Sequence, residues 1–242
     1  MTEISIISVM LLLVLAIAST AYAKERSRFV TAEMRANVLE NAVKYTWARR
    51  EQEEAVSRAE RWVRLSDDEL WEMVTSQELP RAQLTNVGVL YEGQKPGCPN
   101  CGDEIVSYGN YPWKSDFWDA PWKIQCPNCE EVYPKNDFHA FYQTALDENG
   151  MFRRDLGDRS LLFNTEHPDP SDPLHKLYVD DGYGMVDEKG ETHHVVACYN
   201  QFSQWTTIFR ALQALPPAYT LTGDRVYAHK AAVLLDRIAD VY

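Results

Sequence analysis

The sequence lacks an excess of basic residues. Its 242 residues include 24 Lys and Arg against 36 Asp and Glu, and the formal net charge at pH 7 is −12. Proteins that bind DNA or RNA usually present a basic patch to the phosphate backbone. The charge balance therefore argues against a nucleic-acid-binding role, and we predict no nucleic-acid partner.

Lys and Arg are also missing from the first 23 residues, which carry an apolar run from Ile4 to Ala18. This run of about 15 residues is short for a membrane span of ~20. Ala21 and Ala23 fit the small-residue rule for signal-peptide cleavage. We predict a signal peptide at 1–23 and a secreted or periplasmic location. Because no basic residue precedes the apolar run, an uncleaved N-terminal membrane anchor stays open as the alternative.

Cysteine is scarce, and the five cysteines cannot all pair with one another. Four of them form two copies of Cys-Pro-Asn-Cys, at Cys98 and Cys101 and again at Cys126 and Cys129. A Cys-x-x-Cys turn presents both sulfurs to one side, and two such turns that face each other make the tetrahedral four-sulfur site of structural zinc. We predict that these four cysteines bind Zn²⁺.

Two other roles for the cysteines stay open, disulfide bonding and redox catalysis. Export exposes the chain to oxidising conditions, which favour disulfides. Redox catalysis is the weaker alternative, because thiol–disulfide enzymes have a single Cys-x-x-Cys that opens a helix. The fifth cysteine, Cys198, lies in an apolar run and is expected to be a buried free thiol.

The pattern of apolar residues predicts helices at both ends of the chain. Residues 24–64 have helical spacing throughout and indicate one long helix. Ser66 begins a capping box for a short second helix. A further helix is expected from Val195, disturbed near its end by Pro216 and Pro217, and Asp224 can cap the helix that follows.

The middle of the chain is rich in Trp, Tyr, Gly and Pro. Short β segments are predicted beside each Cys pair, at 105–108 and at 122–125. The aromatic residues between the two pairs favour a small core around the metal, and the alternative is an exposed platform for stacking sugars. These residues are Trp113, Phe117, Trp118 and Trp122.

These patterns divide the chain into five parts: the signal peptide at 1–23, an N-terminal helical segment at 24–81, a zinc-ribbon-like subdomain at 82–150, a loop-rich linker at 151–194 and paired helices at 195–242. The last pair leaves an apolar face that needs further cover. We therefore expect an incomplete N-terminal fragment, or a chain that depends on a partner.

The last segment resembles a known family. The residues Ala218–Asp224, Tyr227–Ala231 and Leu234–Tyr242 are similar to the repeating hairpin of (α/α) toroid polysaccharide lyases, in particular heparinase II/III-like and alginate-lyase-like proteins. The turn around Asp181, and the Cys-Pro-Asn-Cys sequence with Tyr133–Phe138, resemble a secreted variant of that family with zinc knuckles. The resemblance implies a mainly α fold that starts an (α/α) toroid, with the zinc-ribbon-like β segment as an insert.

The same resemblance implies a function. Family members cleave acidic polysaccharides that contain uronic acids by β-elimination. This reaction needs a group that neutralises the carboxylate, a base and an acid. In the family these groups come mostly from regions expected beyond Tyr242, so the catalytic residues stay unknown. The candidates for substrate contact in this segment are Asn200, Tyr199, Trp205 and His194.

A second function from another class stays open: a non-catalytic exported zinc-ribbon module that binds a polysaccharide or a partner protein. Exposure of Trp113, Trp118 and Trp122 would favour this module, and burial would favour a structural role for them.

Overall fold

The protein is mainly helical with small antiparallel sheets, which confirms the predicted mainly α class. The structure is a computed structural model that describes residues 29–76, 78–79 and 97–242, with the side chains of 195–199 outside this description. The predicted signal peptide at 1–23 lies outside the described residues. Within the described ranges, no helix combines the length and the apolar character needed to cross a membrane.

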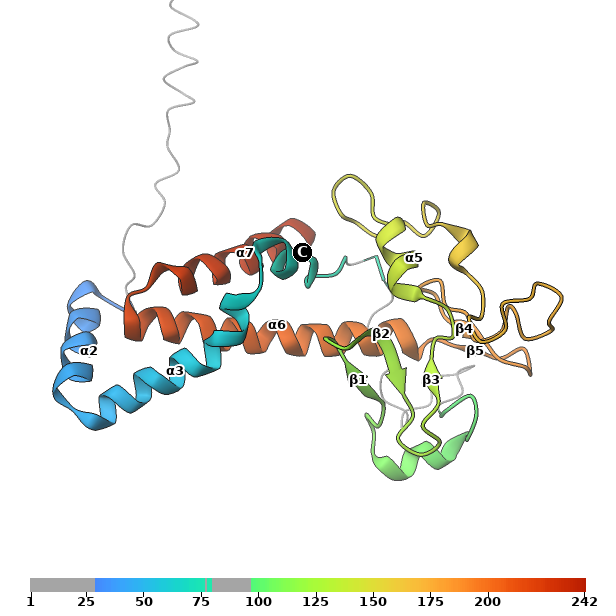
Figure 1. Cartoon of the computed structure of the whole chain (residues 1–242), viewed down its shortest axis with the longest axis horizontal. Coiled ribbons are helices and arrows are strands. Elements are labelled where there is room, and N and C mark those ends of the chain that lie inside the picture. The colour runs from blue at the N-terminus through green and yellow to red at the C-terminus, as the bar shows by residue number, and fades with distance from the viewer. Residues whose placement is uncertain (1–28, 77, 80–96) are drawn as a thin grey trace, which may run out of the picture.

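A long helix, α6, runs through the molecule (Figure 1). Its C-terminal part lies with the other long helices, and its N-terminal end lies beside the strands and α5. The helices are α2 (Ala32–Lys44), α3 (Thr46–Arg64), α4 (Asp67–Glu72), α5 (Phe138–Thr144), α6 (Val195–Thr222) and α7 (Arg225–Val241), with 3-10 turns η2 (Asp103–Tyr108) and η3 (Arg159–Leu161). The strands are β1 (Lys114–Asp116), β2 (Ala120–Gln125), β3 (Val132–Tyr133), β4 (Met185–Val186) and β5 (Thr192–His193).

One hydrophobic core joins the two ends of the chain. Helices α3, α4, α6 and α7 bury their apolar faces together, with Leu70, Ile208, Leu215 and Leu234 fully inaccessible to solvent. The capping box at Ser66 is confirmed, because its hydroxyl accepts a hydrogen bond from the Glu69 N–H. The segments predicted separately at 24–81 and 195–242 therefore share a single core.

The prediction of one long helix over 24–64 is wrong, because the chain breaks at Tyr45. This residue is extended, with φ −123° and ψ 130°, and it ends α2 and precedes α3. Tyr and Thr are weak helix formers, so the break at Tyr45–Thr46 has a low local cost. It lets α2 turn back onto α6, where the Arg35 guanidinium donates to the Tyr219 hydroxyl at 2.9 Å.

The two prolines in α6 do not interrupt it, contrary to the disturbance that the sequence predicts. Pro216 and Pro217 cannot donate backbone hydrogen bonds, which normally weakens a helix. Their neighbours Leu215 and Ala218 are fully buried in the shared core. Tertiary packing therefore keeps the helix continuous through a local sequence that opposes it.

Two small sheets lie near the N-terminal end of α6. Strands β1, β2 and β3 form an antiparallel sheet in that order, with Ile124 of β2 opposite Tyr133 of β3. The strand predicted at 122–125 is confirmed within β2. The strand predicted at 105–108 is wrong: this segment belongs to η2, which ends at Tyr108 and is followed by Gly109 with φ 102°, and Ile105 is buried in the core.

The turn at Asn149 and Gly150 is fastened to α7 by Arg237. Its guanidinium is buried and donates to the carbonyl oxygens of Asn149 and Gly150 at 3.1 and 2.9 Å. A Cβ at Gly150 would lie 2.5 Å from this guanidinium, and φ there is +70°. Only glycine fits such a close approach in this backbone conformation.

Candidate metal centre

The two Cys-Pro-Asn-Cys segments fold into matching turns. In the first turn the N–H of Cys98 donates to the Gly102 carbonyl at 3.0 Å, and the N–H of Gly102 donates back at 2.8 Å. In the second turn the N–H of Glu130 donates to the Cys126 carbonyl at 3.0 Å. Gly102 and Glu130 occupy the same place in the two turns, and both have positive φ, 59° and 64°. The turns differ in one hydrogen bond, because the Cys126 N–H donates to the Glu131 carbonyl at 2.9 Å. The repeated sequence therefore gives two similar turns.

The two turns bring four sulfur atoms together. The Sγ atoms of Cys98 and Cys129 lie 3.6 Å apart, as do those of Cys101 and Cys126, and all four lie within 4.8 Å of one another. A tetrahedral ion with metal–sulfur bonds of about 2.3 Å places its sulfurs about 3.8 Å apart. The four cysteines therefore form a cluster that could hold a metal ion, as the spacing predicts.

Burial makes this cluster unfavourable for uncompensated thiolates. Cys98 and Cys126 are buried, and Cys101 and Cys129 are half-buried. Burial raises the pKa of the Cys98 thiol far above its usual range and also raises the pKa of Cys101. A bound cation would supply the positive charge that the thiolates need.

The Asn of each turn acts to lower the pKa of a cysteine in the opposite turn. Asn128 acts to lower the pKa of the Cys101 thiol, and Asn100 acts to lower that of Cys129, while the Asn128 amide also donates to the Glu104 carboxylate at 2.9 Å. Burial alone raises the pKa of Cys129, but hydrogen bonds from the Glu131 backbone and from Asn100 outweigh it and lower the pKa overall. Partners of this kind orient metal ligands. The Asn that recurs in both Cys-Pro-Asn-Cys segments is the sequence signal for these contacts, and the cysteine spacing alone assigns it no role.

The cysteines are part of a small core. Trp113, Ile105, Ile124 and Tyr133 are all at most 3% exposed and pack around Cys98 and Cys126. The rings of Trp113 and Tyr133 meet edge to face at 6.2 Å. Burial of Trp113 here, and of Trp122 in the neighbouring α5 core, favours the structural interpretation of these aromatic residues over a sugar-stacking platform.

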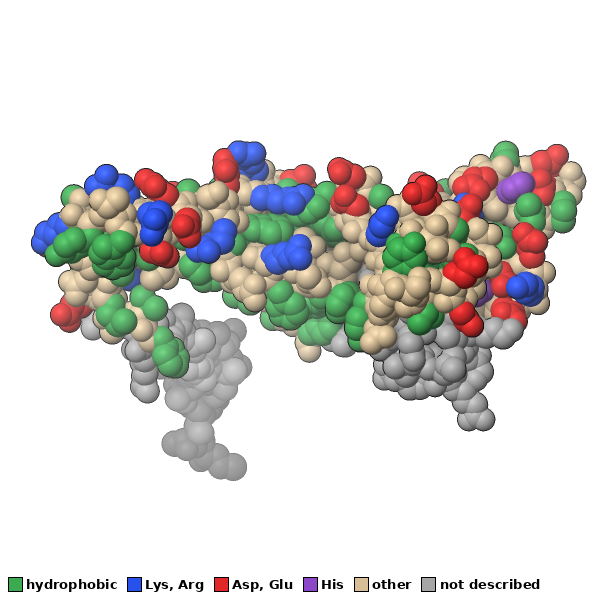
Figure 2. Space-filling model, turned by 90° about the horizontal axis from the view of Figure 1, so that it is seen from below, with side chains coloured by type: hydrophobic (Ala, Val, Ile, Leu, Met, Phe, Trp, Pro, Cys, Tyr) green, Lys and Arg blue, Asp and Glu red, His purple; other side chains and the backbone are tan. Residues whose placement is uncertain are grey.

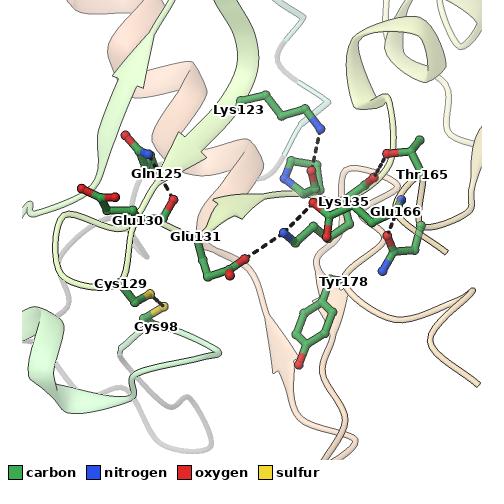
Figure 3. Close-up of polar contacts among 12 residues, drawn as sticks. Cys98, Lys123, Gln125, Cys129, Glu130, Glu131, Lys135, Thr165, Glu166 and Tyr178 are labelled. Atoms are coloured by element: carbon green, nitrogen blue, oxygen red, sulfur yellow. Dashed lines mark hydrogen bonds and ion pairs between the residues drawn. The ribbon is translucent and has the colours of Figure 1, made fainter.

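Lysine side chains connect the metal centre to the loop-rich region, as Figure 3 shows. The Lys135 ammonium lies 2.8 Å from carboxylate oxygens of both Glu131 and Glu166. Burial lowers the pKa of Lys135, but the two carboxylates outweigh this effect and raise it overall. Lys123 donates to the carbonyl oxygens of Pro134 and Asn136 at 2.6 and 2.8 Å. The metal centre is therefore fixed to its surroundings by polar contacts as well as by packing.

The structure spreads the predicted substrate contacts along the start of α6. His194 is half-buried at the N-cap, and the side chain of Tyr199 lies outside the described residues. Asn200 is 5% exposed, and Trp205 packs against Tyr242 with the ring centroids 5.1 Å apart. Five helical residues turn the chain by about 140° beyond a full turn, so Asn200 and Trp205 occupy different faces. Their contact with substrate stays a prediction.

A second group of three side chains lies in the β4–β5 hairpin. Ligand atoms of Asp187, Glu191 and His193 lie within 4.8 Å of one another, and the His193 Nε2 is 3.0 Å from the Asp187 Oδ2. The other oxygen of Asp187 accepts hydrogen bonds from the N–H groups of Lys189 and Glu191. Because both of its oxygens already accept hydrogen bonds within the hairpin, Asp187 mainly stabilises the hairpin turn.

The fold and the site define a mainly helical protein with a four-cysteine cluster that could bind a metal. Comparisons with models of protein families, with curated proteins and with solved structures gave no match.

Proposed function

We propose that the four cysteines hold Zn²⁺ as a structural ion. The support is the gathering of four sulfurs within 4.8 Å of one another, with buried aromatic residues around them. Four protein ligands leave no open coordination position for substrate, which is typical of structural rather than catalytic zinc. The ion would hold the β1–β3 sheet together, because this sheet is too small to be stable alone.

We further propose that the chain is the N-terminal part of an exported polysaccharide lyase that acts on uronic-acid polymers by β-elimination. The observation that carries this proposal is the α6–α7 hairpin, in which Asp224, part of the segment that resembles the family's repeat, caps α7. Exposed apolar side chains on both helices, Phe209 and Leu235 among them, fit a hairpin that packs against further helices.

Charge restricts where an acidic polymer would bind. Residues 146–191 contain twelve Asp and Glu against five Lys and Arg. Arg154 is paired with Asp181, and Arg153 lies 3.7 Å from Asp155, so neither arginine is available as an uncompensated positive charge. Figure 2 shows acidic side chains gathered over this end, whereas Lys and Arg lie mostly over the long helices. The proposed polymer would therefore contact the helical part of the molecule.

The experiment compares this chain with the product of the complete reading frame that contains it. Both proteins are incubated with alginate, heparin and a neutral glucan, and the unsaturated uronate ends made by β-elimination are followed by ultraviolet absorbance. We expect the complete product to cleave one uronate polymer, and this chain to bind that polymer without cleaving it. Absence of both cleavage and uronate binding would overturn the lyase proposal and leave the structural zinc proposal unaffected.

A further inference from the structure

A cavity of about 200 Å³ lies between segments that are distant in the sequence. It is bounded by α4 and the residues after it, by the β1–β2 hairpin, by α5 and by α6. A cavity of about 150 Å³ is large enough to hold benzene. This cavity therefore has room for one six-membered ring with small substituents.

The walls of the cavity are aromatic. Phe117 and Trp118 are half-buried and meet edge to face with ring centroids 4.9 Å apart. The Arg61 guanidinium, which does not line the cavity, lies 3.9 Å from the centroid of the Trp118 ring and covers one of its faces. Phe117 has no such cation over its ring in the part of the chain that the structure describes. Its flat apolar surface suits the C–H face of a ring.

The base of the cavity contains polar groups without protein partners. The side chains of Thr75 and Gln204 are 1% and 4% exposed. Within the described ranges, neither the Thr75 Oγ1 nor the Gln204 Oε1 has a hydrogen-bond partner. Buried oxygen atoms without partners cost free energy. An occupant with hydroxyl groups would supply hydrogen-bond donors at this base.

The rim of the cavity is acidic. Glu69 and Glu72 line it, and no Lys or Arg is present among the described lining residues. The carboxylate of Glu69 accepts the N–H of Ser66 at 2.6 Å, and this hydrogen bond lowers the pKa of Glu69 and keeps it ionised. Lys230 acts on Glu69 from outside the lining, but the charged groups at the rim itself are carboxylates, which repel anions. A uronate or sulfated sugar does not fit this charge.

We propose that this cavity is a binding site for a neutral sugar ring, either free or as one residue of a glycan. The ring's apolar face would stack on Phe117, its hydroxyls would donate to Gln204 and Glu72, and Thr75 would exchange a hydrogen bond with one of them. The site does not depend on lyase activity. No catalytic step is assigned to it.

The test measures sugar binding by the intact chain with isothermal titration calorimetry in the millimolar range. The probes are glucose and N-acetylglucosamine, with glucuronic acid as the anionic comparison, glucosamine as the cationic one and cellotetraose as the glycan. We expect saturable binding of at least one neutral monosaccharide and none of glucuronic acid. Tighter binding of cellotetraose would indicate a glycan residue, and equal binding a free sugar; both results support the site.

Variants locate the binding in this cavity. Glu72 is exposed at the rim, so Glu72→Gln should fold normally and weaken binding about tenfold by removing a charged hydrogen-bond acceptor. Phe117→Ala should weaken it by a similar factor, with the near-ultraviolet circular dichroism confirming the fold. Phe209→Ala, an exposed aromatic residue on α6 outside the cavity lining, is the matched control and should bind as the wild type does.

Three results would overturn the proposal. The first is no saturable binding of either neutral monosaccharide or of cellotetraose. The second is unchanged affinity in both Glu72→Gln and Phe117→Ala. The third is tighter binding of glucosamine or glucuronic acid than of the neutral sugars, which would assign the cavity to a charged ligand.

Discussion

Asp180 gives the molecule a dependence of stability on pH that can be worked out from its surroundings. Its side chain is fully buried, and one carboxylate oxygen accepts hydrogen bonds from the N–H groups of Gly182 and Gly184 at 2.7 and 3.1 Å. The other oxygen, Oδ2, has no partner within the described part of the chain. Burial raises the pKa of Asp180 from 3.8 to about 6, although the two hydrogen bonds lower it.

The raised pKa of Asp180 determines whether the protein becomes more or less stable as the pH rises. Because the pKa of Asp180 is higher in the folded state, the folded protein binds the proton more tightly than the unfolded chain does. The resulting stabilisation is complete below the unfolded pKa of about 3.8 and is lost as the pH rises through about 6. The full shift corresponds to about 3 kcal/mol. When the pH is lowered from 7 to 5, the contribution of Asp180 to the free energy of unfolding rises by about 1.3 kcal/mol. The rest of the roughly 3 kcal/mol is gained below pH 5.

The assay is urea unfolding of the wild type and of Asp180→Asn at pH 5 and pH 7. Asparagine keeps the shape of the neutral carboxyl group but does not titrate. All other groups are common to both proteins, so the change in unfolding free energy on acidification should be about 1.3 kcal/mol more favourable in the wild type. Glu148→Gln, at an exposed position, is the control and should follow the wild type. Equal pH dependence in the wild type and Asp180→Asn would refute the reasoning.

Three further perturbations test the fold. Cys126→Ser should make the β1–β3 region sensitive to protease while the helical core still unfolds cooperatively, because the metal would stabilise mainly that region; equal protease resistance in the variant and the wild type would contradict this. Leu234 and Leu235 are adjacent in the sequence, but they are 0% and 53% exposed. In urea unfolding, Leu234→Ala should lower the free energy of unfolding by about 2–5 kcal/mol and Leu235→Ala by less than about 0.5 kcal/mol. Similar losses in the two variants would count against the assigned core. Ser66→Ala should cost about 1 kcal/mol through loss of the capping box, and an unchanged urea midpoint would show that the cap is dispensable.

Features that depend on neighbouring residues could be predicted from the sequence. The caps at Ser66 and Asp224 are confirmed, because capping involves residues within one turn of each other. The convergence of the four cysteines is confirmed as well, although it joins two segments. It was predictable because a repeated Cys-x-x-Cys has few other uses at this spacing.

Features that depend on packing between distant segments could not be predicted. The break at Tyr45 lets α2 reach α6, and the continuity of α6 through Pro216 depends on the buried residues around it. In both cases the residues that pack together lie far apart in the sequence. The cavity is also not predictable from the sequence, because Thr75, Phe117 and Gln204 come together only in the folded chain.

The most direct test of the account is the metal content of the purified protein. Mass spectrometry of the metals, together with titration of the native thiols, would be carried out on the wild type and on Cys98→Ser. The account predicts one zinc ion per wild-type chain, with the four cluster thiols slow to react until a chelator is added, and loss of the ion in the variant. A wild-type chain without stoichiometric metal, whose cluster thiols react at once or are oxidised to disulfides, would contradict the central claim.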